Sequence, residues 1–259
     1  MKTRIAFAKL NVLFAIFAAA SLAWAAVRVN AATVSISSAS AVDNPNYDLT
    51  NTYGIGDWAY WASTADPASG APSNEKSGAS LIGDMSVVGG GNLRGSTSGN
   101  VPAYDLDFAD GTSAVSGTAS NLIGLFNSQL QEVGAGLQLD VVSPTADPFN
   151  IFAWGTAYNA GGTLTATVGA ASDADALLNY GGSRSPGRFY TVAVDPDFIG
   201  QTVNLSLELT ADNGGFANVS LAGVAVDTAA RTVIPEPATF LIWSLLAGVG
   251  VGLGWRRRK

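Results

Sequence analysis

Residues 161–168 read Gly-Gly-Thr-Leu-Thr-Ala-Thr-Val, and from Leu164 onward every second residue is apolar. Successive side chains of a β-strand point to opposite faces, so this alternation predicts a strand with one buried and one solvent-exposed face. The same period recurs at residues 104–108, 137–141, 190–194, 205–209 and 219–221. Turn residues separate these segments, as in Asp212-Asn213-Gly214-Gly215. Short strands without crossover helices predict an all-β fold, an antiparallel β-sandwich of the jelly-roll kind.

Two segments break this pattern. Leu122, Phe126, Leu130 and Val133 have helical spacing after a possible cap at Ser120, so a short helix is an alternative to an irregular connection there. Residues 172–178 are compatible with another turn of helix.

Composition excludes several function classes. Eight of the 13 basic residues lie near the two termini, which leaves five between them against 19 acidic residues. Such a segment repels phosphate backbones, so nucleic acid is not an expected partner. The sequence has no Cys and no His, which excludes disulfides, thiolate nucleophiles and Ser-His-Asp triads.

The N-terminal segment, residues 1–31, has the order of a signal peptide. Lys2, Arg4 and Lys9 precede an apolar run over residues 10–24, and small residues follow. Cleavage after Ala25 or after Ala31 fits equally, and an uncleaved anchor is the alternative. Residues 32–230 then form the predicted β-sandwich ectodomain.

The C-terminal segment, residues 231–259, contains an uncharged run over residues 238–255. At 1.5 Å per residue this run reaches roughly 27 Å as a helix, close to the hydrocarbon thickness of a bilayer. It therefore predicts one transmembrane helix. The basic cluster that follows, residues 256–259, predicts a cytoplasmic end, because positive residues stay inside.

Pro235, Glu236 and Pro237 stand just before this predicted helix, and Arg256, Arg257 and Arg258 follow it. A Pro-Glu-Pro motif, one hydrophobic helix and an arginine cluster in this order resemble the PEP-CTERM sorting signal. The resemblance implies recognition by an exosortase, after signal peptidase has acted at the other end. It also implies a protein anchored in the inner membrane at first and later released to the cell surface or exterior. A permanent anchor is the alternative.

The middle of the chain is similar to galactose-binding-like jelly-roll domains. The residues that support the similarity are Asp57–Trp61, Gly161–Val168 and Gly200–Leu207. The similarity implies a fold and supplies no site.

Aromatic residues are the first candidates for a binding site. Trp58 and Tyr60 share one face of an extended segment, as do Phe152 and Trp154. If exposed, Trp58, Tyr60 or Trp154 would stack on a sugar ring of an exopolysaccharide or another glycan. If buried, they are core, which is the favoured interpretation.

Charged residues suggest two further candidates. Acidic residues two apart offer paired oxygen ligands for a structural Ca²⁺, with solvated acidic faces as the favoured alternative; the pairs are Asp105 with Asp107, Asp173 with Asp175, and Asp195 with Asp197. Arg184 and Arg188 flank a polar loop that would recognise an acidic sugar through guanidinium hydrogen bonds, and an ordinary surface loop is the alternative. No other cofactor is expected.

These observations predict an exported, exosortase-sorted surface or matrix protein with a non-enzymatic structural or interaction ectodomain. A carbohydrate-binding module is the first alternative. A glycan-acting hydrolase is the second, and it requires a cleft that holds two carboxylates.

Overall fold

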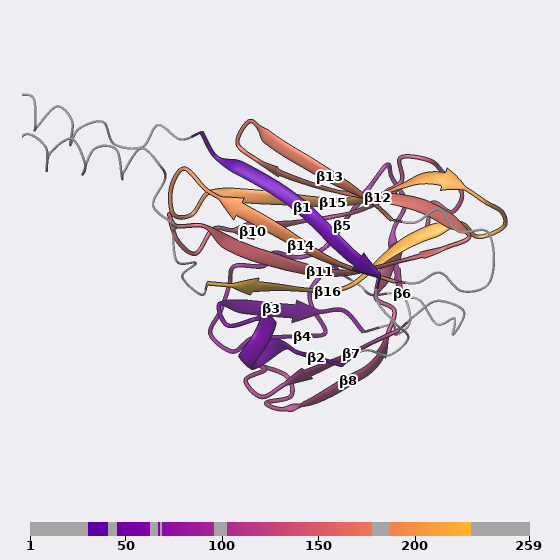
Figure 1. The fold of residues 1–259 in the computed structure, drawn as a ribbon. Coiled ribbons are helices and arrows are strands. Elements are labelled where there is room, and N and C mark those ends of the chain that lie inside the picture. The colour runs from indigo at the N-terminus through magenta and orange to yellow at the C-terminus, as the bar shows by residue number, and fades with distance from the viewer. Residues whose placement is uncertain are drawn as a thin grey trace, which may run out of the picture. The chain divides into compact units, whose positions relative to one another are not determined.

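The computed structural model describes residues 31–40, 46–62, 67, 69–95, 103–177 and 187–228. These residues belong to one compact unit that ends at Ala229. The described residues form an all-β fold of three stacked sheets (Figure 1). The all-β prediction and the antiparallel sandwich are therefore confirmed for the described part of the chain.

The first layer is a five-stranded antiparallel sheet. Its strands, in spatial order, are β13 (Ala171–Leu177), β12 (Ala160–Val168), β15 (Thr202–Asp212), β10 (Gly136–Val142) and β5 (Ser86–Val88). Leu164, Ala166 and Val168 of β12 are buried, and the threonines between them are partly exposed. The alternation that predicted this strand thus also identifies its buried face.

The middle layer is an eight-stranded antiparallel sheet. Its main path runs through β1 (Thr33–Ser40), β14 (Arg188–Asp195), β11 (Phe149–Tyr158), β16 (Asn218–Asp227), β3 (Asp57–Tyr60) and β4 (Asn74–Glu75). Two short strands extend it, because β9 (Leu125–Asn127) also pairs with β16 and β6 (Leu93–Gly95) pairs with β9. Strands β11 and β16 are buried almost throughout. Both faces of this sheet must therefore be covered.

The third layer is a three-stranded sheet of β2 (Asn46–Asp48), β7 (Tyr104–Phe108) and β8 (Gly117–Leu122). Strands β2 and β7 are parallel, whereas β7 and β8 are antiparallel. A single π-helical turn, η1 (Leu49–Tyr53), follows β2 and is capped by Asp48, whose Oδ1 accepts from the backbone N–H groups of Thr50 and Asn51. The parallel pair is an exception to the antiparallel pattern.

Neither of the two segments for which the sequence left a helix open is helical. Leu122 ends β8, Phe126 lies in β9, and Leu130 and Val133 lie in the connection that follows. Gly124 interrupts the segment with φ +90°, and a Cβ there would meet the backbone of Leu221 at 1.9 Å. The chain passes too close to β16 for a helix to form. Residues 172–177 are strand β13, because they pair along β12.

An aliphatic core fills the space between the five-stranded and eight-stranded sheets. It includes Leu164 and Leu205 from one sheet and Ile151, Val192 and Val224 from the other. Each of these side chains is at most 1% exposed. The core matches the half-buried strands that the sequence predicted.

An aromatic core lies on the opposite face of the eight-stranded sheet, beneath the three-stranded sheet. Its fully buried members include Trp58, Trp154, Tyr104 and Leu106. The Trp154 ring contacts the rings of Tyr47, Tyr53 and Phe189 at centroid distances of 5.3, 6.0 and 5.6 Å. Burial raises the pKa of Tyr47 to about 12, and its neighbour Tyr53 adds to the shift. The three-stranded sheet therefore covers these rings and buries them against the eight-stranded sheet.

Candidate functional site

The outer face of the five-stranded sheet consists of short polar side chains. Strand β12 contributes Thr163, Thr165 and Thr167, which are all partly exposed. The strand register aligns polar residues across the sheet; the aligned pairs are Thr165 with Ser206, Thr167 with Asn204, Gln138 with Ser206, and Asp140 with Asn204. Because most apolar residues of the same strands point into the aliphatic core, this face carries mainly hydroxyl, amide and carboxylate groups, and Val142 at the end of β10 is an exposed exception.

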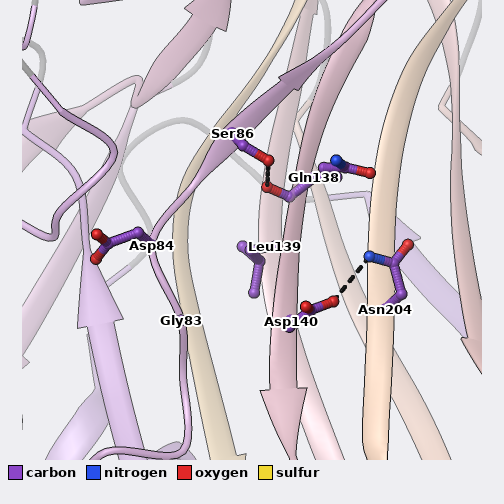
Figure 2. Close-up of a pocket in the computed structure, with 7 residues that line it drawn as sticks. All are labelled: Gly83, Asp84, Ser86, Gln138, Leu139, Asp140 and Asn204. Carbon is purple, nitrogen blue, oxygen red and sulfur yellow. Dashed lines mark hydrogen bonds between the residues drawn. The ribbon is translucent and has the colours of Figure 1, made fainter.

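A shallow groove lies at one edge of this face (Figure 2). Its volume is about 160 Å³, and it lies between β5, β10 and β15. The residues that line it are Gly83, Asp84, Ser86, Gln138, Leu139, Asp140 and Asn204. Two hydrogen bonds hold its walls: Asn204 Nδ2 donates to Asp140 Oδ1 at 2.9 Å, and Ser86 Oγ donates to the Gln138 carbonyl at 3.4 Å. Strand pairing therefore fixes the positions of these groups.

The electrostatics of the groove favour a neutral ligand. Asp84 and Asp140 both line it, and no basic residue does. Lys76 is instead paired with Asp110, with 2.7 Å between Nζ and Oδ2. Asn204 and Gln138 supply amide groups that both donate and accept. Hydroxyl groups of a ligand would find acceptors here, whereas phosphate, sulfate or carboxylate would meet like charge.

The candidate aromatic residues form no exposed platform. Trp58 and Trp154 are both 0% exposed, and the Trp58 ring stacks on Tyr60 with centroids 6.2 Å apart. Tyr60 is half-buried at the edge of the same aromatic core, and Phe152 is buried in it. These rings cover the eight-stranded sheet, so Trp58 and Trp154 belong to the core, which is the interpretation that the sequence favoured, and Tyr60 lies at its edge.

The structure places one of the two candidate arginines. Arg188 begins β14, is half-buried, and its Nη1 donates to Ser40 Oγ at 3.5 Å. Its Nε is buried without a hydrogen-bond partner. Arg184 lies outside the described residues. The two guanidinium groups therefore form no site within the described part of the chain.

The candidate calcium ligands have protein partners. Asp105 Oδ1 accepts from Asn121 N at 2.8 Å, and Asp107 accepts from Thr118 Oγ1 and Asn46 Nδ2. Asp173, expected on an acidic face, instead accepts from the backbone N–H of Ile36 at 2.7 Å.

Asp195 ends β14, and Asp197 is exposed and accepts from Gln201 Nε2 at 3.4 Å. No group of three or more acidic residues suited to a metal occurs among the described residues. The paired carboxylates are therefore separate surface or bridging groups in this structure.

The signal peptide and the sorting signal lie outside the described residues, including Pro235, Glu236, Pro237 and the arginines at 256–258. Within the described ranges, no helix has the length and apolar character that crossing a membrane requires.

No family model, curated protein or solved structure matches this chain.

Sequence reasoning missed the groove, although it had placed two of its residues. Gln138 and Asp140 alternate with the apolar residues of their strand, which predicted that they face solvent. Asn204 becomes a neighbour of Asp140 only because β15 pairs with β10. Asp84 joins them because the segment before β5 lies at the same groove. A sequence pattern within one strand does not reveal such neighbours.

Proposed function

We propose that this chain is an exported envelope or matrix protein, sorted by an exosortase, whose folded domain is a non-enzymatic interaction module. The PEP-CTERM-like tail and the signal-peptide pattern support export and sorting. The folded domain supports the interaction role, because its exposed sheet face is polar and its recess is shallow.

The strand order supports a jelly roll. Strands β3, β16, β11 and β14 are neighbours in one sheet, and β10, β15, β12 and β13 are neighbours in the other. From β10 to β16 the chain crosses between the two sheets at every connection except the β12–β13 hairpin. Two interlocked Greek keys have this order. The three-stranded sheet would then be an addition specific to this chain.

A non-enzymatic role is supported by the surroundings of the carboxyl groups. Burial raises the pKa of Asp57, as a general acid requires, but this carboxyl is only 3% exposed. Its oxygens accept from the backbone N–H groups of Trp58, Leu81 and Ile82. A substrate cannot reach it. In the groove, Asp140 is bonded to Asn204, and the recess is smaller than the 300–1,000 Å³ of typical ligand pockets.

Binding of a neutral glycan is the second candidate function, and the groove is the observation that favours it. Asn204 and Asp140 are held by their mutual hydrogen bond, so these two groups need little ordering when they meet sugar hydroxyls. Because no aromatic side chain lines the groove, affinity would come from hydrogen bonds and would be weak for a single sugar unit. Repeated units of a polysaccharide would raise the apparent affinity through multivalency.

The sorting proposal is tested with two epitope tags on the same chain. One tag is placed before Val233 and the other after Arg258, and cell fractions are blotted for both. We expect a surface or released product that keeps the first tag and lacks the second. Two tags that remain together in the inner membrane would show that the tail is a permanent anchor.

The groove is tested by glycan-array binding of the exported product, followed by a double variant, Gln138→Ala with Asn204→Ala. We expect signal on neutral polysaccharides and its loss in the variant. Thr163→Ala is the matched control, since Thr163 lies on the same sheet face but does not line the groove. Equal loss in the control, or binding confined to acidic glycans, would exclude the groove as the site.

A further inference from the structure

Both connections from the folded domain to the terminal segments leave at one end of the eight-stranded sheet. Strand β1 begins at Thr33, which pairs with Asp195 at the end of β14. Strand β16 ends at Asp227, which pairs with Asn150 near the start of β11. In Figure 1 the start of β1 and the end of β16 lie on the same side of the domain. We call this side the junction end.

Exposed apolar side chains gather at the junction end. Phe198 and Ile199, in the turn between β14 and β15, are 57% and 67% exposed. Ile55 precedes β3 and Val142 ends β10, and both are also exposed. Among the described residues, seven large hydrophobic side chains are exposed, and these are four of them.

Hydrogen bonds connect these positions across the junction end. Gly56 N donates to Val226 O at 2.9 Å, which places Ile55 beside the end of β16. Val142 N donates to Leu81 O at 2.7 Å, and Leu81 N donates to Asp57, the first residue of β3. Ser143 N donates to Gln201 O at 2.9 Å, which ties the end of β10 to the turn that holds Phe198 and Ile199. The apolar side chains therefore belong to one continuous rim.

The connection from β16 to the C-terminal apolar run, residues 238–255, limits the distance between that run and this rim. Nine residues, 229–237, separate Thr228 from the start of that run. Fully extended they span roughly 30 Å at 3.3–3.6 Å per residue. If residues 238–255 span a bilayer, as the proposed function requires, the junction end stays within roughly 30 Å of the membrane surface. A tether this short gives an effective concentration on the order of millimolar, so a weak contact is occupied.

We propose that the junction end rests on the lipid surface while the tail is uncleaved, with Phe198, Ile199 and Ile55 inserted into the interface. The occupant is a zwitterionic phospholipid surface, because the surrounding charges do not favour an anionic one. Asp195, Asp197 and Asp227 lie at this end. Lys76 donates to Gly54 O there, but its charge is paired with Asp110. Cleavage of the tail then frees the domain, because two or three apolar side chains without a tether hold a protein on lipid only weakly.

The absence of cysteine from the sequence allows a direct test on the full chain. Single-cysteine variants Ile199→Cys, Phe216→Cys and Leu246→Cys are labelled with an environment-sensitive fluorophore and reconstituted in phosphatidylcholine nanodiscs that contain spin-labelled lipid. Phe216 is the matched control: it is 68% exposed, but it lies in the β15–β16 turn at the opposite end of β16. Leu246 reports the tail.

We expect the labels at 246 and 199 to shift to the blue and to be roughly halved in intensity by the spin-labelled lipid, with no change at 216. Quenching at 246 without quenching at 199 would overturn the membrane contact and leave the tail proposal intact. Equal quenching at 199 and 216 would also overturn the membrane contact, since lipid would then meet both ends of the domain equally. No quenching at 246 would refute the tail proposal and the contact with it.

A second lipid composition tests the chemistry of the contact. Replacing part of the phosphatidylcholine with phosphatidylglycerol adds negative charge beside the aspartates of the junction end. We expect less quenching at position 199 and unchanged quenching at position 246. Stronger quenching at 199 on the anionic discs would contradict an apolar contact and indicate a basic one.

Discussion

The two faces of the eight-stranded sheet are buried in different ways. On one face, aliphatic side chains from two sheets pack against each other, and strands β10 and β12 of the five-stranded sheet alternate between this core and solvent. On the other face, rings of Trp58, Tyr104 and Trp154 are covered by the small sheet and by η1. The aliphatic face is built from long regular strands, whereas the aromatic face depends on three short strands and one helical turn. The same strands, β11 and β16, thus connect a regular core to an irregular one.

This difference explains the polar outer surface of the domain. Trp58, Trp154 and the rings around them pack beneath the third layer, and no aromatic side chain lines the groove on the five-stranded sheet. The side of the molecule rich in aromatic side chains is therefore structural, and the proposed binding side has only small polar groups.

The largest expected effect is loss of a ring from the aromatic core. Trp154→Ala removes a fully buried indole and should lower the free energy of unfolding by about 3–5 kcal/mol. Leu164→Ala, its matched change in the aliphatic core, should cost about 2–5 kcal/mol. Urea unfolding measures both. We expect hydrogen exchange to accelerate selectively in β7 for the first variant and across both large sheets for the second. Identical exchange patterns would show that the two cores unfold as one.

The next effect concerns the polar link between β3 and the segment at residues 81–82. Asp57→Ala removes the acceptor of three backbone N–H groups, which should cost about 3 kcal/mol because these donors are left buried. Asp57→Asn keeps one acceptor oxygen and should cost less. The midpoint of urea unfolding measures the difference. If the alanine and asparagine variants were equally stable, these hydrogen bonds would not hold the segment.

The two faces should also respond to pH in opposite directions. Burial raises the pKa of Asp57 above its ordinary value near 3.8, despite the backbone N–H groups. The folded state then binds this proton more tightly than the unfolded state. The contribution of Asp57 to stability therefore rises as pH falls from the raised pKa toward 3.8, and it decreases as pH rises through that window.

Asp110, which bonds to Trp58 of the aromatic core, should behave conversely. Partial burial pushes its pKa upward, but hydrogen bonds from Lys76, Trp58 and Thr50 outweigh this and hold the pKa below 3.8. The contribution of Asp110 to the free energy of unfolding is present above pH 3.8 and is lost as pH falls through the lowered pKa. Unfolding of Asp57→Asn and Asp110→Asn across pH 3–7 should give differences from wild type of opposite slope. Parallel slopes would contradict this assignment.

The smallest expected effect is at the junction end. Phe198→Ser should change the free energy of unfolding by no more than about 0.5 kcal/mol, because the ring is mostly exposed. Thermal unfolding of the variant beside wild type checks this. A loss above about 1 kcal/mol would mean that Phe198 packs against the domain, which would remove it from the proposed lipid contact.

The sequence predicted the regular part of the fold well for a physical reason. Where one face of a strand is buried and the other faces solvent, apolar and polar residues alternate visibly in the sequence. Residues 104–108 and 164–168 show this alternation, and both segments are strands. The helix that was one of two alternatives from Leu122 to Val133 does not form, because helical spacing takes no account of the close approach of Gly124 to β16. Contacts between distant strands decided the outcome.

The candidate site was less predictable. Trp58 and Trp154 attract interest in a sequence because they are large, yet the third layer that buries them cannot be read from local patterns. The groove pairs Asp140 with Asn204, 64 positions apart, and such a neighbour depends on strand register. Sequence reasoning identified which residues face solvent, but it did not identify which of these residues contact one another in the folded domain.

The fate of the tail tests the central claim most directly. Peptide mapping and intact-mass measurement of the protein recovered from the cell surface and the medium should give a C-terminus near Pro235 to Pro237 and no peptide that contains Trp243. If the dominant species retains peptides through Trp243, the tail is not removed, and the protein is a membrane-anchored one rather than a sorted and released one.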